Sequence, residues 1–546
     1  MKSRICNAIL ILLLLPKLSS AAGAAEQLGR ISFPTSCSPA VQATFERAVA
    51  LLHSFQYEES ETGFTDLAQQ DRHCAMAYWG KAMSLYHQLW DHPDAETLAK
   101  GRADIEKAKA IGVKTQRERQ FIGAAGVFYQ DTPGLDYAGR AIAYSKGMEM
   151  VYQHYPQDIE AAAFYALSLI AIPGDDSDLT NRRKAIAILD KFFAQEPDHP
   201  GIAHYLIHAS DTPQLAPLGL EAARRYAKIA PGSAHALHMP SHIFTRLGLW
   251  QESIESNIAS AAAAEKMTAM HLEGASYQLH AMYFLHYAYL QTGQVAKARQ
   301  LQSKLKSVRG ATADRLADSQ ATFAAEDAME QHHWKEAAAL VDEIRNGRGK
   351  DWPAGVKAET YWASAIGAAR SGDVTAARKD IEKLKQARAE SNAKNMGYTT
   401  NGTEQVDVQE AEAWLALGEG KPNDAVKTLG AAADQEDKKG VDSLTMPARE
   451  MLGDMLLGLH QPGGALAAFE AALAESPNRF DGLYGAARAA ELSGAGEKAK
   501  SYYSKLEDLC VPISDERPEL RQARTFLAQS RGSANSGGKN SRPSRQ

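Results

Sequence analysis

Histidines concentrate in one part of the sequence, and their spacing is suited to metal binding. Eight of the 17 histidines lie between residues 204 and 286. Two pairs, His204/His208 and His238/His242, each have members four residues apart, which places both rings of a pair on one face of a helix. The pairs are offset by 34 residues at both members. In a 34-residue helical repeat, equivalent positions lie on neighbouring helices, so we expect these four imidazoles to form a rectangle on one surface.

Three interpretations of the four histidines remain open. Imidazole nitrogens bind zinc, copper or iron, so the rectangle is a candidate metal site if the nitrogens converge within ~2.0–2.1 Å of one ion. Alternatively, the rings are structural groups satisfied by hydrogen bonds. In a third interpretation they line a pocket for a peptide or a small ligand. Pro240, which lies inside the second pair, predicts that a helix begins or kinks there, because proline lacks the N–H that a helix interior needs.

The elements that position these residues follow a period of 34. Near the C-terminus, small and aromatic residues recur after 34 positions: Ala465, Phe469 and Ala472 are followed by Ala499, Tyr503 and Leu506. This order resembles the tetratricopeptide repeat, in which two antiparallel helices pack through small residues and aromatics. We expect an all-α fold, a right-handed helical-repeat solenoid of such helix pairs. No stretch alternates as a strand does, and the 34-residue register favours an open solenoid over a closed helical toroid.

The resemblance also indicates which side chains line the groove. In tetratricopeptide proteins, repeat positions 2, 5 and 9 face the concave groove, where ligands bind. One repeat places His235, His238 and His242 at these positions, and the next places His280, Tyr283 and Tyr287 there. The repeat frame near the N-terminus adds three further residues to the expected groove, at positions 5, 9 and 13: Trp79, Met83 and His87. The resemblance implies that such a groove holds a peptide or protein partner.

The N-terminus predicts export. Residues 1–24 have the form of a signal peptide, with Lys2 and Arg4 before an apolar run of eight residues; an uncleaved anchor is the alternative. We expect the protein to be periplasmic or extracellular, with no transmembrane segment in the mature chain. Under oxidising conditions we expect Cys37 and Cys74 to pair, since each precedes a helical pattern and they lie about one repeat apart. Three free thiols, including Cys510, are the alternative.

Several segments resemble a histidine-rich group of exported bacterial tetratricopeptide proteins of largely unassigned function. They are residues 33–39, 51–55 and 74–80 and the two histidine motifs. We expect an N-terminal repeat unit over 25–305, a C-terminal one over 306–530 and a disordered tail over 531–546. The net charge of −6 gives no electrostatic support for a nucleic-acid partner.

Motifs of known catalytic chemistry are missing from the sequence. It contains no H-E-x-x-H, G-x-S-x-G or P-loop motif, so no residue is assigned a catalytic role and enzymatic activity stays an open question. We expect an exported scaffold that binds a peptide or protein in its groove. The alternative is a metalloprotein, a metal carrier or metal-dependent enzyme, with a histidine-ligated transition metal in the groove. Its expected ligands are the four paired histidines, with His235 or His280 as further candidates.

Overall fold

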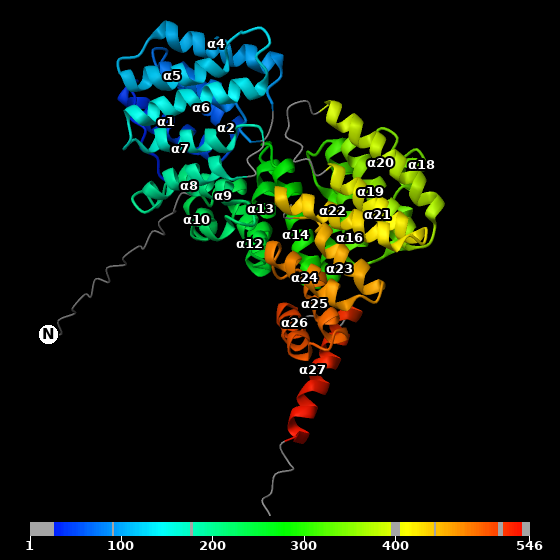
Figure 1. Cartoon of the computed structure of the whole chain (residues 1–546). Coiled ribbons are helices and arrows are strands. Elements are labelled where there is room, and N and C mark those ends of the chain that lie inside the picture. Colours follow the sequence, from blue (N-terminus) through cyan, green and yellow to red (C-terminus); the bar gives the residue numbers. More distant parts are fainter. Residues whose placement is uncertain are drawn as a thin grey trace, which may run out of the picture.

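The chain folds into helices that pair in antiparallel fashion along the sequence (Figure 1). A computed structural model describes residues 27–89, 92–174, 178–394, 404–441, 444–510 and 517–537. These residues contain no strand, and helices that follow one another in sequence pack side by side. The all-α helical-repeat class expected from the sequence is therefore confirmed.

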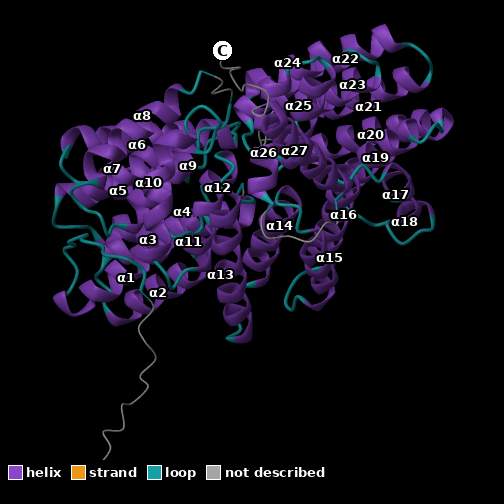
Figure 2. Ribbon diagram, turned by 90° about the horizontal axis from the view of Figure 1, so that it is seen from below, coloured by secondary structure: helices purple, strands orange, loops and turns teal. Residues whose placement is uncertain are grey.

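The helices fall into three groups along the chain (Figures 1 and 2). The N-terminal group comprises η1 (Pro39–Val41), α1 (Gln42–His53), α2 (Tyr57–Gln70), α3 (Ala75–Ser84), α4 (Ala95–Ile111), α5 (Gln116–Phe128), α6 (Tyr137–His154), α7 (Ile159–Ile170), α8 (Thr180–Phe193), α9 (Pro200–Ser210) and α10 (Ala216–Ile229). The middle group comprises α11 (Ala234–His238), α12 (Pro240–Arg246), α13 (Trp250–Ala269), α14 (Ala275–Gln291), α15 (Val295–Lys304) and η2 (Leu305–Ser307). The C-terminal group comprises α16 (Ala313–Glu330), α17 (Trp334–Ala339), α18 (Asp342–Arg345), α19 (Ala354–Arg370), α20 (Val374–Lys394), α21 (Glu404–Gly418), α22 (Pro422–Lys439), α23 (Ala448–Gly458), α24 (Pro462–Glu475), α25 (Phe480–Leu492), α26 (Gly496–Leu509) and α27 (Pro518–Gly537).

Contacts between small residues and aromatic rings hold the helix pairs together. The ring of Phe469 on α24 lies so close to Gly453 and Gly485, on the helices before and after it, that a Cβ at either glycine would lie within 2.8 Å of the ring. Phe64 and Gly80 form the same kind of contact between α2 and α3. Since a side chain at these glycines would push the helices apart, the small–aromatic pattern seen in the sequence sets the close approach of neighbouring helices.

The C-terminal group folds back onto the middle group. The indole N–H of Trp250 donates to the carbonyl of Asn478 at 2.7 Å. Gly248 adopts φ +63°, and the carbonyl oxygen of Pro477 occupies the space that a Cβ there would need. A buried ion network lies behind this contact, in which Arg479 binds both Glu450 and Glu330 at 2.8–3.0 Å. The C-terminal group therefore packs against the turn between α12 and α13, next to the helices that carry the histidines (Figure 2).

The inner side of the N-terminal group is filled by aromatic side chains. Trp79 and Met83, expected to line the groove, are each only 1% exposed, so this expectation was wrong. The physical reason is that Phe33, from the extended segment before α1, packs against Trp79 at 5.5 Å between ring centroids, and Phe164 packs against it at 5.6 Å. These rings, which come from other parts of the chain, cover the side chain of Trp79.

The two ends of the chain lie partly or wholly outside the described residues. The expected signal peptide over residues 1–24 is outside them, as are residues 538–546 of the expected tail. The first seven residues of the segment expected to be disordered belong to α27, which continues through Gly537. Extending a formed helix costs far less than starting one, which accounts for this overrun. Among the described residues, no helix is both long and apolar enough to span a membrane.

Candidate metal centres

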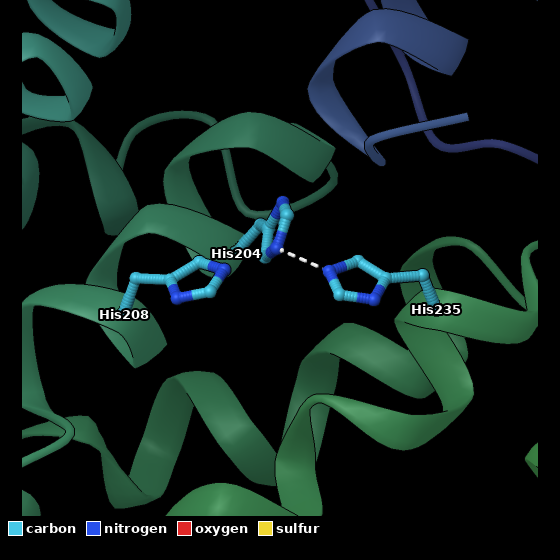
Figure 3. Close-up of side chains that lie close together, drawn as sticks. All are labelled: His204, His208 and His235. Atoms are coloured by element: carbon cyan, nitrogen blue, oxygen red, sulfur yellow. Dashed lines mark hydrogen bonds between the residues drawn. The ribbon is translucent and has the colours of Figure 1, made fainter. Parts of the chain in front are cut away.

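Three histidine rings meet between α9 and α11. His204 and His208 leave one face of α9, and His235 reaches them from α11 (Figure 3). One ring nitrogen of each lies within 4.8 Å of the other two. The Nε2 atoms of His204 and His235 are 3.0 Å apart, the contact drawn as a dashed line in Figure 3. We call these three residues the first cluster.

A second group of three histidines lies next to it. His238 at the end of α11, His242 on α12 and His280 on α14 also place one nitrogen each within 4.8 Å of the others. The Nε2 atoms of His238 and His242 are 3.0 Å apart. We call these three residues the second cluster.

The two clusters adjoin each other. Ring centroids of His208 and His242 are 6.4 Å apart, and those of His235 and His238 are 6.3 Å apart. Within the first cluster the rings of His208 and His235 are separated by 6.2 Å, so the distance between clusters barely exceeds the distances inside them. Six imidazoles thus form one continuous patch.

The four histidines expected to share one ion are divided between the two clusters. The pair on α9 goes to the first cluster, and His238 with His242 goes to the second. α12 begins at Pro240, where the sequence predicted that a helix begins or kinks. His235 and His238 both lie on α11 before this point, and they contact His204 and His242 respectively. His235 and His280, expected as groove residues and as further candidate ligands, supply the third member of each cluster.

Hydrogen bonds fix the rings of the second cluster. The Nδ1–H of His238 donates to Asn257 Oδ1 at 2.7 Å, and the Nδ1–H of His242 donates to Asp211 Oδ2 at 2.9 Å. Asp211 also accepts from Arg246 Nε at 2.9 Å. With both Nδ1 atoms carrying hydrogen, both Nε2 atoms present lone pairs to each other at 3.0 Å.

The ring of His204 is fixed in the same way. Its Nδ1–H donates to the backbone carbonyl of His53 at 2.6 Å, which leaves the lone pair of Nε2 facing His235. The carbonyl sits in a strained turn, because Phe55 two residues later adopts φ +55°. The Nε2 atom of His208 is buried and has no hydrogen-bond partner. A buried nitrogen without a partner is costly, and a metal ion would satisfy it.

An aromatic wall backs each cluster. The ring of Phe55 lies 4.4 Å from the His204 ring and 5.5 Å from that of His208. The ring of Phe284 lies 4.8 Å from the His238 ring and 4.6 Å from that of His242. Such walls restrict the imidazole rotamers and keep water away from one side of the nitrogens.

The surroundings keep five of the six imidazoles neutral, those of His204, His208, His235, His238 and His280. Burial, and then the positive charges of neighbouring rings, lower the pKa of His235 and His238 well below the ordinary value. Burial lowers the pKa of His204 to about 3. Burial opposes ionisation of Asp211, but Arg246 and then His242 outweigh it and hold the pKa of its carboxyl well below the usual range. Metal binding requires neutral imidazoles, and an ionised carboxylate that accepts from a ligand histidine orients its ring.

Two other clusters of possible ligands do not suit a metal. His53 Nε2 and His199 Nε2 both donate to Glu160, at 2.8 and 3.1 Å, and the remaining ring nitrogens accept from Tyr205 and from the backbone of Ile202. Each of these imidazole nitrogens therefore already has a partner, and the arrangement is a structural ion cluster. Near Asp71, the sulfur atoms of Cys37 and Cys74 are joined in a disulfide, the pairing that the sequence suggested, with 4.7 Å between the Cα atoms.

The other expected groove residues are scattered. His87 stacks on Tyr57, with 4.2 Å between ring centroids, and its Nε2–H donates to the carbonyl of Ser84. Tyr287 is buried, and its hydroxyl donates to the carbonyl of Thr445 in the C-terminal group. Tyr283 lines a cavity together with His280. The structure therefore does not gather these side chains into one binding surface.

Some residues that shape the clusters were not found from the sequence. Asp211 follows the first pair by three residues and Asn257 lies on α13, and no motif marks either of them. Nothing in the sequence marks Phe55 and Phe284 as the walls of the clusters either, because an aromatic residue at a helix boundary or on a helix face is common in any core.

Comparisons with known proteins show likeness of architecture at low similarity. No protein-family model matches the chain, and no curated protein matches it. Human IFIT1, solved as a dimer with m7Gppp-AAAA, is 12% identical with a TM-score of 0.36, over 80% of this chain and 90% of that one. A tetratricopeptide repeat protein from Parabacteroides merdae is 12% identical with a TM-score of 0.29, over 55% of this chain and 98% of that one. The APC/C hetero-tetramer Cut9–Hcn1 is 11% identical with a TM-score of 0.33, over 90% and 89% of the two chains. At such scores these likenesses carry no argument about function.

Proposed function

We propose that this helical-repeat protein is a metalloprotein that binds two transition-metal ions, one at each histidine cluster. The observation that carries the proposal is the contact between His238 and His242. Their Nε2 lone pairs face each other at 3.0 Å while both Nδ1 hydrogens are committed to Asn257 and Asp211. Two lone pairs at this distance repel unless a cation lies between them.

A metal ion meets this requirement better than a proton. Burial and the positive charges of His280 and His242 lower the pKa of His238, which disfavours a shared proton. Two nitrogens that each lie ~2.0–2.1 Å from one zinc ion in tetrahedral geometry are ~3.3 Å apart, close to the 3.0 Å in the second cluster. The separation of these two nitrogens therefore fits an ion after a shift of a few tenths of an ångström.

The chemistry of the donors narrows the choice of ion. Both clusters offer imidazole nitrogens only, and hard cations such as Mg²⁺ and Ca²⁺ prefer oxygen ligands. Among divalent first-row ions, nitrogen sites bind copper most tightly, and zinc is bound by three histidines in known catalytic sites. We therefore propose copper or zinc as the physiological ion, ahead of iron.

Metal analysis of the purified chain tests the proposal. The protein is stripped with a chelator, reloaded with Zn²⁺ or Cu²⁺, desalted and measured by inductively coupled plasma mass spectrometry. We expect two ions per chain, one ion in His208→Ala or His280→Ala, and none in the double variant. His154→Ala, a surface histidine outside both clusters, serves as the matched control and should keep two. A stripped and reloaded protein without stoichiometric metal refutes the proposal.

The peptide- or protein-binding scaffold is the less supported candidate. It rests on the helical-repeat architecture, while the side chains expected to form its groove are buried or dispersed. A metal carrier and a metal-dependent enzyme are both compatible with the two clusters. Which of the two applies depends on whether solvent or a ligand can reach each ion.

Export remains part of the proposal. The Cys37–Cys74 disulfide supports it, because such bonds persist in oxidising compartments. N-terminal sequencing of the protein recovered from a bacterial periplasm tests it, with a start at residue 25 expected and a start at Met1 contradicting it.

A further inference from the structure

The two clusters differ in their access to solvent. In the first cluster His204 is 0% and His235 is 3% exposed, and the rings of Phe55 and Tyr226 lie 4.4 and 5.1 Å from that of His204. In the second cluster, His280 is exposed. Structural metal sites are closed by protein ligands, whereas catalytic sites keep a coordination position open. The second cluster has the arrangement of an open site.

A cavity lies beside the exposed ring. It has a volume of about 160 Å³ and is formed between α14, α16 and α19. His280 forms part of its wall, and the other lining residues include Tyr283, Arg315, Asp318 and Glu359. A cavity of ~150 Å³ holds a molecule the size of benzene, so this one has room for a small organic ligand. His280 thus borders both the second cluster and the cavity.

The charges around this cavity are mixed. Its wall carries the guanidinium group of Arg315 and the carboxyl groups of Asp318 and Glu359. Burial raises the pKa of the Asp318 carboxyl and raises that of Glu359 to about 7. Thr322 donates to Glu359 at 2.7 Å. A divalent ion on three neutral imidazoles adds two further positive charges to this wall.

We propose that the metal at the second cluster keeps one coordination position open toward this cavity, and that a small organic carboxylate binds there between the ion and Arg315. The guanidinium group suits a carboxylate because its planar N–H donors match two carboxylate oxygens. The first cluster, closed by aromatic rings, holds its ion without such a ligand. This inference rests on the proposed metal binding and adds the ligand class and the site that receives it.

Anion titration of the copper-loaded protein tests this inference. Metal content is measured first, and the Cu²⁺-loaded chain is then titrated with azide, whose charge-transfer absorption reports binding at an open copper position. We expect one azide per chain, displaced by benzoate but not by uncharged benzamide. His280→Ala should abolish the azide band, whereas His208→Ala should keep it.

Substitution of the guanidinium group tests its role. We expect Arg315→Met to weaken the displacement of azide by benzoate at least tenfold. Arg309→Met, an exposed arginine outside the cavity, is the matched control and should behave as the parent chain does. Two coppers per chain without any azide band, equal displacement by benzoate and benzamide, or equal effects of the two arginine variants would overturn the inference while leaving metal binding intact. A chain that binds neither copper nor zinc refutes the proposed function itself, and the ligand site with it.

Discussion

Asp211 offers the sharpest test of the second cluster, since it acts on an imidazole without being a ligand. Its two oxygens accept from His242 Nδ1 and from Arg246 Nε, both at 2.9 Å. The substitution Asp211→Asn preserves the shape of the side chain but supplies only one oxygen. Whichever way the amide turns, one of the two donors then faces an NH₂ group. If that donor is His242, the ring proton moves to Nε2 and blocks the atom that should bind the metal.

The expected effect is large and confined to one site. Removing a carboxylate that orients a metal-binding histidine typically costs 10–100-fold in metal affinity, or about 1.4–2.8 kcal/mol. We therefore expect Asp211→Asn to weaken the second site by this factor and to leave the first unchanged. Competition between the protein and a chromophoric zinc chelator measures both affinities in one titration.

Two further variants show whether the effect of Asp211→Asn is specific to the second site. In a His280→Ala background, which lacks the second site, Asp211→Asn should have no effect on the remaining ion. Asp104→Asn is the matched control, because Asp104 is 14% exposed and paired with Lys81 at 3.0 Å, far from the histidines, whereas Asp211 is 19% exposed. The reasoning fails if Asp211→Asn binds zinc as the parent does, or if it weakens the ion left in the His280→Ala background.

Three other predictions concern stability. Replacing Cys37 and Cys74 by serine opens a loop of 37 residues and should destabilise the N-terminal group by about 3–4 kcal/mol, measured by urea denaturation. The pKa of Glu359 is raised from 4.5 to about 7 by burial, so the folded state binds more protons than the unfolded state between these pH values and stability falls as pH rises. Glu359→Gln should therefore raise the melting temperature at pH 8 and change it little at pH 4; an equal shift at both would contradict this assignment. Arg479→Met leaves the carboxyl of Glu450 buried without its partner and should cost about 3–5 kcal/mol, seen as earlier unfolding of the C-terminal group; unchanged unfolding would exclude a stabilising role for the network.

Much of the architecture could be predicted from local patterns. The 34-residue recurrence of small and aromatic residues indicated helix pairs, and the contact of Phe469 with Gly453 and Gly485 is the physical event behind it. The start of a helix at Pro240 followed from the missing N–H alone. These inferences succeeded because each depends on residues close in sequence or on one repeat interface.

The expectations that failed depended on distant parts of the chain. Trp79 and Met83 occupy positions that face a groove in a regular repeat, but Phe33 and Phe164 arrive from other segments and cover Trp79. No feature near residues 79–83 could reveal this. The same holds for Asn257, whose contact with His238 depends on how α13 packs against α11 and not on any motif.

The division of the six histidines into two clusters follows the positions that they occupy in the repeat. That frame places His238 and His242 at positions 5 and 9 of one repeat and His280 at position 2 of the next, and the second cluster consists of these three residues. The first cluster follows the same rule, because His204 and His208 precede His238 and His242 by one period and His235 occupies position 2. Each site is thus built from two positions of one repeat and one position of its neighbour.

This rule explains why there are two sites and why they differ. Positions 5 and 9 of the following repeat hold Tyr283 and Tyr287, so the series of histidine pairs stops there and no third cluster forms among the described residues of that repeat. The last cluster in such a series lacks a further histidine pair beyond it and faces the cavity between α14, α16 and α19 instead. The open position of the second cluster is therefore a consequence of where the repeated histidine motif ends. The double substitution Tyr283→His with Tyr287→His adds one more histidine pair to the series. It should not close the open position unless the next repeat also supplies a histidine at position 2.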